Sequence, residues 1–567
     1  MIKVRWFFLA LVFLLVVAGL WLWWSRPRQG DMAAYAPADC LLYLESNSLI
    51  DIAQTIVSTD AWKSLNSLHP IWSTSNFTTV QKFLALTGLG PTQEVVLARA
   101  QVAFVILDLN TIEEGTTLRV RPEAAVLIET HTSGWRVKPL MEKILATFAV
   151  NAYQQPIFKR SVEGSTEFLH WTAPDPSRQI VCALNGSFVV IGNSEMAVRN
   201  CIATRLGQRP SLRDHNELQS MRKMLSSERA LAFGFISSKN AAHLVALGIP
   251  FLFGEAPGEL HLERLIAASA TKILGPIGWI ASPASEGVED RYLFLLQPAV
   301  ISRLAPLTIT SDADDETFRM IPADVRSLTI YKYADPLAAW QSFESAVGSQ
   351  LDTLSAVVFD SFLESALAPY GIQKPKQFLA AVNSNIISIR RAADPEHSLL
   401  IAKLRDKQLL YESLQKFSKD APREQTGANK IWAELETGAA VASMGQHIIL
   451  GPYSGVRDFV QATEIANENN SGLLRQPTRF VPRASTAGVV TYSDDSERMV
   501  RFVTTLMQLN KQPHDESAQI KQLMGQLPFS ATETILTDLG FERRTRSSFG
   551  LFALLVPLLK PEEASSR

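Results

Sequence analysis

Residues 37–56 read PADCLLYLESNSLIDIAQTI, and residues 322–343 read PADVRSLTIYKYADPLAAWQSF. Each stretch opens with Pro-Ala-Asp, continues through a short apolar run and ends in a segment of helical character. Proline and aspartate are turn residues, and a short apolar run that follows them predicts a strand. The chain therefore contains the same domain opening twice, which predicts an internal repeat.

Four later blocks match in the same order between the two parts of the chain. The matched residues, with the opening included, are Pro37 with Pro322, Gly90 with Gly371, Pro122 with Pro395, Gly186 with Gly445, Gly192 with Gly451, and Gly287 with Gly540. The distance between matched residues shrinks steadily along the chain, as loop deletions in the second copy would produce. We therefore expect two copies of one unit of about 250 residues, the size of a large domain.

The repeat sets the expected domain boundaries. At 567 residues the chain is too long for one ordinary domain. The stretch TITSDADDETFRM (308–320) is polar and acidic between apolar segments, which is typical of a linker. The expected parts are a first repeat at 37–305, an acidic linker at 306–321, a second repeat at 322–560 and a polar tail at 561–567.

Both copies mix strand and helix patterns, which predicts the α+β class. Short runs rich in β-branched residues predict strands, and apolar residues at helical spacing predict helices that pack on a sheet. Asn185-Gly186 between two strand-like runs predicts a hairpin turn, so we expect largely antiparallel sheets. The expected strands are 102–109, 124–129, 188–192, 385–390, 398–403 and 447–451, and the expected helices include 135–148 and 494–507.

Residues 6–24 read WFFLALVFLLVVAGLWLWW, nineteen apolar residues without a charge. This length is close to the ~20 residues that a helix needs to cross a bilayer. The tryptophans at its end suit a membrane interface, and there is no small-residue cleavage site. We therefore expect residues 1–28 to be an uncleaved signal anchor. It would hold a single-pass protein in the inner cell membrane, with a cytoplasmic N-terminus and the bulk of the chain outside the cytoplasm.

Charge and cysteine content limit the class of protein. The 54 basic and 56 acidic side chains leave a net charge of −2, so nothing points to a nucleic-acid partner. Three cysteines are too few for a disulfide scaffold. Cys182 and Cys201 either form one bridge or lie buried as small apolar side chains, as we expect for Cys40.

Motifs that serve standard enzyme mechanisms are missing from the sequence. It contains no Cys-x-x-Cys pair, no Gly-x-Ser-x-Gly elbow and no phosphate-binding glycine loop. The acidic run at 312–316 has Thr317 where a calcium loop needs glycine. We expect no cofactor, no metal site and no catalytic residue. An active site assembled from distant residues would carry no such motif, so an enzyme stays an alternative.

The two copies share one charged pattern, Gly-x-Glu-x-Arg. It places Glu289 and Arg291 in the first copy against Glu542 and Arg544 in the second. Residues two apart in a strand lie on the same face, so each pair is expected to form a surface ion pair. The other interpretation is a charged strand that faces a ligand or a partner.

The end of the chain carries a second apolar run, FGLFALLVPLL (549–559). Eleven residues are too few to span a bilayer, although they suffice to lie in a membrane interface. The counterpart in the first copy, YLFLLQPAV (292–300), has a strand pattern. We therefore expect 549–559 to be a buried final strand.

An anchor, then a Pro-Ala-Asp opening that leads into an apolar strand, then a glycine with a helix and paired strands, resembles a bacterial extracytoplasmic family whose domain has no known function. The resemblance implies an envelope location and transfers no catalytic residue. We expect a membrane-anchored binding or structural module of the cell envelope, with an envelope protein or an apolar ligand as partner. Two alternatives stay open: an envelope hydrolase with a site between the repeats, and a carrier of lipid or another apolar ligand.

Overall fold

The computed structural model describes residues 29–66, 100–114, 117–175, 177–253, 269–285, 287–312, 321–322, 324–392, 396–416, 424–425, 430–435, 438–468, 485–509 and 517–555. The predicted membrane span at 6–24, the polar tail and half of the acidic linker (313–320) lie outside these residues. In the part of the chain that is described, no helix combines the length and apolarity needed to cross a membrane.

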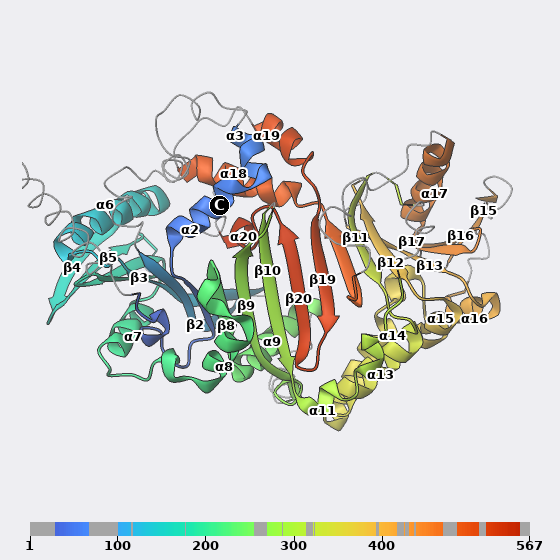
Figure 1. The fold of residues 1–567 in the computed structure, drawn as a ribbon, viewed down its shortest axis with the longest axis horizontal. Helices are drawn as coiled ribbons and strands as arrows, with labels where there is room; N and C mark the ends of the chain where they lie inside the picture. The colour runs from blue at the N-terminus through green and yellow to red at the C-terminus, as the bar shows by residue number, and fades with distance from the viewer. Residues whose placement is uncertain are drawn as a thin grey trace, which may run out of the picture.

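Helices and antiparallel strands alternate along both halves, which confirms the α+β class (Figure 1). The first-half strands are β1 (Leu42–Ser46), β2 (Gln101–Glu114), β3 (Thr117–Glu129), β4 (Ile157–Glu163), β5 (Thr166–Thr172), β6 (Gln179–Asn185), β7 (Phe188–Gly192), β8 (Ala232–Ile236), β9 (Leu274–Pro283) and β10 (Val288–Leu296). The first-half helices are η1 (Met32–Ala34), α2 (Leu49–Ser58), α3 (Asp60–Asn66), α6 (Gly134–Tyr153), α7 (Glu195–Arg205), η3 (Leu212–Asp214), α8 (Asn216–Leu225), η4 (Ser227–Arg229), α9 (Ser238–Phe253), α11 (Pro298–Ile301) and η5 (Ala305–Thr308).

The second half has a similar series of elements. Its strands are β11 (Val325–Tyr331), β12 (Ile386–Arg391), β13 (Ser398–Lys403), β14 (Glu424–Gln425), β15 (Lys430–Glu434), β16 (Ala439–Met444), β17 (His447–Pro452), β18 (Val489–Ser493), β19 (Ser530–Leu536) and β20 (Gly540–Ser547). Its helices are α13 (Pro336–Gly348), α14 (Thr353–Ser365), η6 (Ala368–Tyr370), α15 (Pro375–Ala381), α16 (Lys407–Ser413), α17 (Tyr453–Glu468), α18 (Ser496–Leu509), α19 (Ser517–Met524) and α20 (Phe552–Leu555).

Antiparallel pairing joins all the described strands into one sheet. Its order is β4-β5-β6-β7-β3-β2-β1-β8-β9-β10 in the first half, and β20-β19-β18-β11-β12-β13-β17-β16-β15-β14 in the second. Each half therefore has the same pairing order, counted outward from the β10–β20 pair. At that junction Arg291 lies opposite Arg544, and these are the two residues that the sequence comparison matches.

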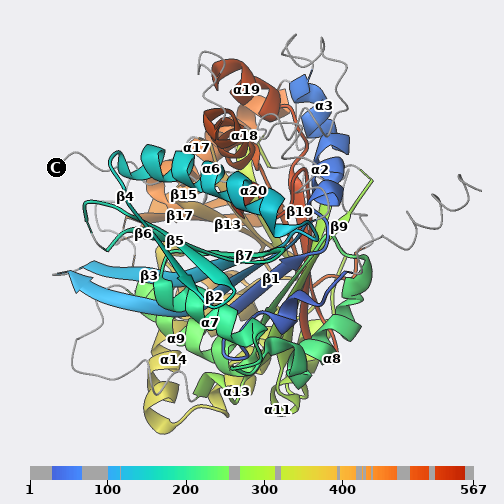
Figure 2. The same cartoon turned by 90° about the vertical axis from the view of Figure 1, so that its left-hand side faces the viewer.

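The helices bury the apolar faces that the sequence predicts. On α6, Val137, Met141 and Leu145 pack on β5 and β6, and Figure 2 shows α6 above and α7 below these strands. On α18, Met499 and Phe502 join a cluster that also contains residues of α2, α3, β9 and β10. This cluster therefore spans both halves of the sheet.

Glycine turns form the hairpins that the strand patterns predict. Gly186, with a φ of 64°, connects β6 to β7, and Gly445, with a φ of 63°, connects β16 to β17. Positive φ in these two-residue hairpins is a conformation that glycine adopts without strain. The predicted turn at Asn185-Gly186 is confirmed.

The prediction of a final strand at 549–559 is wrong for the residues that are described. β20 ends at Ser547, and a turn at Gly550, with a φ of 59°, leads into the short helix α20. The turn is held by two hydrogen bonds, from the Gly550 N–H to Ser547 Oγ at 3.0 Å and from the Leu551 N–H to Asp290 Oδ2 at 2.9 Å. Apolar composition alone does not distinguish a short buried helix from a strand.

Candidate functional site

The four charged residues predicted from the repeat meet at the β10–β20 junction. In the antiparallel register Arg291 lies opposite Arg544, and Glu542 lies opposite Leu293. Residues directly opposite in such a pair share one face of the sheet. The pairing of the last strands of the two halves therefore gathers all four side chains on one face.

The ion pairs differ from the predicted ones, because two of them cross the junction. Arg291 donates from Nε to Glu542 Oε1 at 2.7 Å and from Nη2 to Oε2 at 3.1 Å. Arg544 donates from Nε to the same Oε1 at 2.5 Å, as the sequence predicts. Glu289 instead accepts a hydrogen bond from Arg546 at 2.7 Å. The predicted Glu289–Arg291 pair is wrong, because the strand from the other half supplies closer partners.

Glu542 is buried rather than on the surface, with 7% of its side chain exposed. Burial by itself raises the pKa of Glu542, but hydrogen bonds from Arg291 and Arg544 outweigh it and lower the pKa below its usual value. The carboxylate is therefore ionised and fully engaged. This arrangement joins the two halves, and all four predicted side chains take part in ion pairs.

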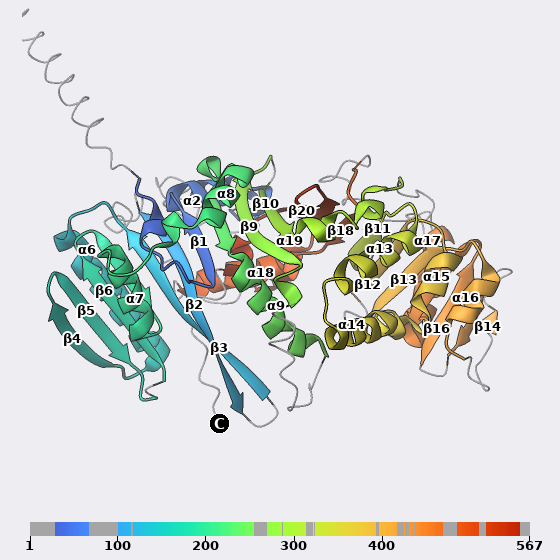
Figure 3. The same ribbon diagram turned by 90° about the horizontal axis from the view of Figure 1, so that it is seen from below.

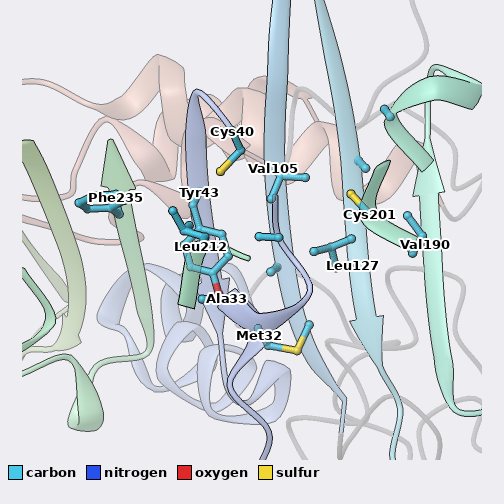
Figure 4. Packing of buried hydrophobic residues seen from close by; sticks show 14 of the residues in the cluster. Met32, Ala33, Cys40, Tyr43, Val105, Leu127, Val190, Cys201, Leu212 and Phe235 are labelled. Carbon is cyan, nitrogen blue, oxygen red and sulfur yellow. The ribbon is translucent and has the colours of Figure 1, made fainter. Parts of the chain in front are cut away.

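A second charged cluster lies in the first half and was missed in the sequence. Arg222 on α8 donates from Nη2 to Glu45 Oε1 at 2.7 Å and to Asp31 Oδ1 at 3.0 Å, and from Nη1 to Asp31 Oδ2 at 3.2 Å. Tyr43 donates its hydroxyl to Glu45 Oε2 at 2.7 Å. Figure 4 shows Tyr43 on β1 among apolar side chains such as Val105 and Leu212. We call Asp31, Tyr43, Glu45 and Arg222 the polar network.

Burial dominates the electrostatics of the polar network. It raises the pKa of Glu45 above its usual value, although Arg222 and Tyr43 act in the opposite direction. It also raises the pKa of Tyr43, together with the negative charge of Glu45. A raised pKa for a buried carboxyl is a feature that clusters at functional sites.

The polar network borders a cavity of about 890 Å³ between β1, β8, α8 and the chain before η1. This volume is in the range of small-molecule sites. Its charged lining residues are Asp31, Glu45, Arg222, Lys223, Glu228 and Arg229. The lining thus carries three acidic and three basic side chains, which suits a polar ligand with charges of both signs.

The second half fills the matching positions with apolar residues. β1 lies between β2 and β8, as β11 lies between β12 and β18. Ile330 is the counterpart of Glu45 in the second half. Glu45 is opposite Ala103 and Phe233, and Ile330 is opposite Ile387 and Val490.

By the same pairing, Tyr43 corresponds to Leu328, which is as fully buried as Tyr43. A fold that accepts leucine and isoleucine here does not need tyrosine and glutamate. The signal was present in the sequence, since aligning Pro37 with Pro322 sets Tyr43 against Leu328 and Glu45 against Ile330. A comparison limited to the residues that match between the two halves misses this difference.

A smaller cavity of about 470 Å³ lies in the second half, near the start of α13. Lys403, Arg405 and Asn385 line it together with Asp335. Asp335 is used as a helix cap, accepting a hydrogen bond from the Ala338 N–H at 3.0 Å, and Asn385 donates to the Asp312 carbonyl at 2.7 Å. Asp335 and Asn385 are therefore engaged in local structure.

The three cysteines are free and buried, so Cys182 and Cys201 do not form a bridge. Cys182 packs in the α6 cluster, and Cys40 and Cys201 pack in the cluster of Figure 4. Burial raises the pKa of each thiol. Within the described residues, no group of three or more His, Cys, Asp or Glu side chains is placed to hold a metal ion.

Comparison with protein-family models, with curated proteins and with solved structures finds no match for this chain. The candidate site therefore stands on its geometry alone.

Proposed function

We propose that this protein is a membrane-anchored binding module of the cell envelope, built from two copies of one α+β unit. In this proposal the first copy binds a polar ligand in the cavity beside Arg222. The second copy serves as a structural partner. The observation that carries the proposal is the buried pair Tyr43 and Glu45 of the polar network, which occupies positions where the second half has Leu328 and Ile330.

The duplication is supported by two independent features. The sequence blocks match in order, and the two halves have the same order of strand pairing around the β10–β20 junction. Duplicated units free one copy to change while the other keeps the fold. Replacing a buried ion pair by packed apolar residues is often neutral for stability, so the tyrosine and glutamate kept where the second half has leucine and isoleucine suggest a role beyond stability.

The proposed anchor brings the cavity close to the membrane. Gln29, Gly30 and Asp31 line the cavity, and the predicted span ends at Trp24. Five residues of extended chain reach about 18 Å at most. A ligand in this cavity would therefore be bound near the outer surface of the bilayer, which agrees with the envelope location implied by the family resemblance.

The two alternatives have less support. A hydrolase between the repeats needs a free acid, base or nucleophile at the junction, where the four predicted residues take part in ion pairs. A carrier of an apolar ligand needs an apolar cavity, whereas the larger cavity is lined by six charged residues.

The test exchanges the first-half residues for their second-half counterparts. The double variant Tyr43→Leu/Glu45→Ile keeps β1 buried with residues that the fold accepts at the matching place. Full-length wild type and variant are screened by thermal shift with amino acids and with di- and tripeptides. We expect ligands that stabilise the wild type and leave the variant unchanged.

Arg213→Gln is the control, because Arg213 is an exposed arginine that pairs with Asp214 outside the cavity. It should bind the same ligands as the wild type. Equal binding by wild type and double variant, or no binding by either, would reject the cavity as the ligand site.

A further inference from the structure

β4 forms one outer end of the described sheet, as Figure 3 shows. Among the described residues it pairs with β5 alone, and all seven of its residues are exposed. An unpaired strand edge offers backbone N–H and C=O groups to another strand, and soluble proteins normally protect such edges.

The hairpin geometry decides which backbone groups of β4 point outward. Gly164 and Ser165 form a two-residue turn, and Gly164 has a φ of 59°. In such a hairpin the flanking residues, Glu163 and Thr166, form a hydrogen-bonded pair, and hydrogen-bonded residues alternate along the strand. The backbone groups of Phe158, Arg160 and Val162 therefore point away from β5, toward the open edge.

Apolar side chains accompany this open edge. Phe158 is 45% exposed and Val162 67%, both on one face of the strand, and Ile157 on the other face is 57% exposed. Exposed apolar residues are common singly, but a group of them along a free strand edge marks an interaction site.

The charge at the middle of β4 is already neutralised. Arg160 contacts Glu142 of α6 at 2.7 Å and Glu167 of β5 at 3.2 Å. An uncompensated charge would deter pairing with another edge, whereas a compensated one does not. The β10–β20 junction uses the same arrangement, with two arginines opposite each other and Glu542 between them.

We propose that β4 pairs with β4 of a second copy of this chain, antiparallel and centred on Arg160. This register sets Phe158 of one copy opposite Val162 of the other, twice, and buries both apolar pairs. Lys159 lies opposite Ser161 of the other copy and diagonal to both Glu163 and Lys159 of that copy, so attraction and repulsion balance on this face and the apolar pairs supply the contact. The two sheets become continuous through the β4 edges, which pair with β5 alone among the described strands.

Cross-linking of the full-length chain, purified in detergent, tests the register. In the double variant Lys159→Cys/Ser161→Cys the new cysteines face each other as a non-hydrogen-bonded pair, where the Cα atoms are about 4.5 Å apart. Mild oxidation should convert most of the chain to a disulfide-linked dimer. The native cysteines are buried and do not compete.

Sedimentation of the uncross-linked protein tests the interface without new cysteines. We expect the wild type to be dimeric, and Val162→Lys to weaken the dimer at least tenfold. Val150→Lys is the matched control, because Val150 is 52% exposed but lies on α6 away from the strand edge. A monomeric wild type, or a dimer that Val162→Lys leaves unchanged, overturns the proposal; the latter result would place the contact elsewhere in the chain.

Discussion

Glu542 is the carboxylate that keeps two arginines opposite each other at the β10–β20 junction. In Glu542→Gln only one side-chain oxygen remains to accept hydrogen bonds, and Arg291 and Arg544 face each other without the carboxylate that lies between them. Removing one member of a buried ion pair is strongly destabilising, so we expect a loss of about 3 kcal/mol in the free energy of unfolding at pH 7. Chemical denaturation of the full-length protein measures it.

Glu289→Gln is the comparison, because Glu289 makes one pair and 27% of its side chain is exposed. We expect a loss of at most about 1 kcal/mol from this variant. The pKa of Glu542 is lowered in the folded protein, so its contribution is present above the unfolded pKa and is lost as the pH falls below it. Equal losses from the two variants at pH 7 would contradict the assignment.

Asp290 predicts the opposite dependence on pH. It accepts hydrogen bonds from Trp279 Nε1 and from the Leu551 N–H, both at 2.9 Å, and burial raises its pKa to about 6 from 3.8. The folded protein therefore holds this proton more tightly than the unfolded chain. The free energy of unfolding should fall by about 3 kcal/mol over the whole titration, about 2 kcal/mol of it between pH 4 and pH 6, and level off above about pH 6.5.

Asp290→Asn removes this titration. Denaturation of wild type and variant at several pH values gives the difference between their free energies of unfolding. We expect this difference to change between pH 4 and pH 6 and to stay constant from pH 6.5 to pH 8. A difference that is flat across the lower range would show that Asp290 titrates normally.

At the scale of elements, α8 packs closely on β9 at one position, Gly278. A Cβ at Gly278 would overlap Met221 and lie 2.7 Å from Leu225 Cδ1, and both residues belong to α8. Gly278→Ala should therefore push α8 away from the sheet and cost about 1–3 kcal/mol. Since Arg222 is on the same helix, we also expect ligand binding in the cavity to weaken.

The control for Gly278→Ala is Gly348→Ala, since an added Cβ at Gly348 meets nothing within 4 Å. It should leave stability nearly unchanged. Adding Met221→Ala to Gly278→Ala makes room for the new methyl group and should recover part of the lost stability. If the double variant is less stable than both single variants, the contact is not the cause.

Elements set by local pattern were predictable from sequence, and those set by distant contacts were not. β7, β13 and β17 match the expected strands closely, because each is a short apolar run, bounded by glycines for β7 and β17 and preceded in the sequence by a proline for β13. The residues of α20 were predicted to form a strand. The prediction failed because the start of α20 depends on a hydrogen bond from the Leu551 N–H to Asp290 in the other half. The pair between Arg291 and Glu542 was not predicted for the same reason, whereas the local pair between Glu542 and Arg544 was.

The candidate site was missed for a different reason. Tyr43 and Glu45 alternate with apolar residues in β1, which is the pattern of a strand with one exposed face. Arg222 lies far along the chain on α8 and pairs with Glu45, so this glutamate is buried in an ion pair rather than exposed. No local pattern encodes that contact, although the mismatch between the two halves at these positions marks where to look.

At the scale of the whole molecule, the two halves share a hydrophobic core as well as a sheet. Phe502 of α18 is fully buried, with its ring 4.9 Å from that of Phe549, in a cluster that includes Ile56 and Trp62 of the first half. Cores that are continuous across a boundary unfold together. We therefore expect β9, β10, β20 and β19 to form one cooperative unit.

Hydrogen exchange on Phe502→Ala tests this coupling across the boundary. Removing a buried phenylalanine costs about 3–5 kcal/mol, so exchange protection should fall by the same factor in β9 and β10 of the first half as in β19 and β20 of the second. Phe378→Ala is the matched control, because Phe378 is equally buried in a cluster confined to the second half. It should reduce protection most in β12 and β13, and less in β9 and β10. If Phe502→Ala weakens β19 and β20 but leaves β9 and β10 protected, the halves unfold independently, and the β10–β20 pair is a contact between two separate domains.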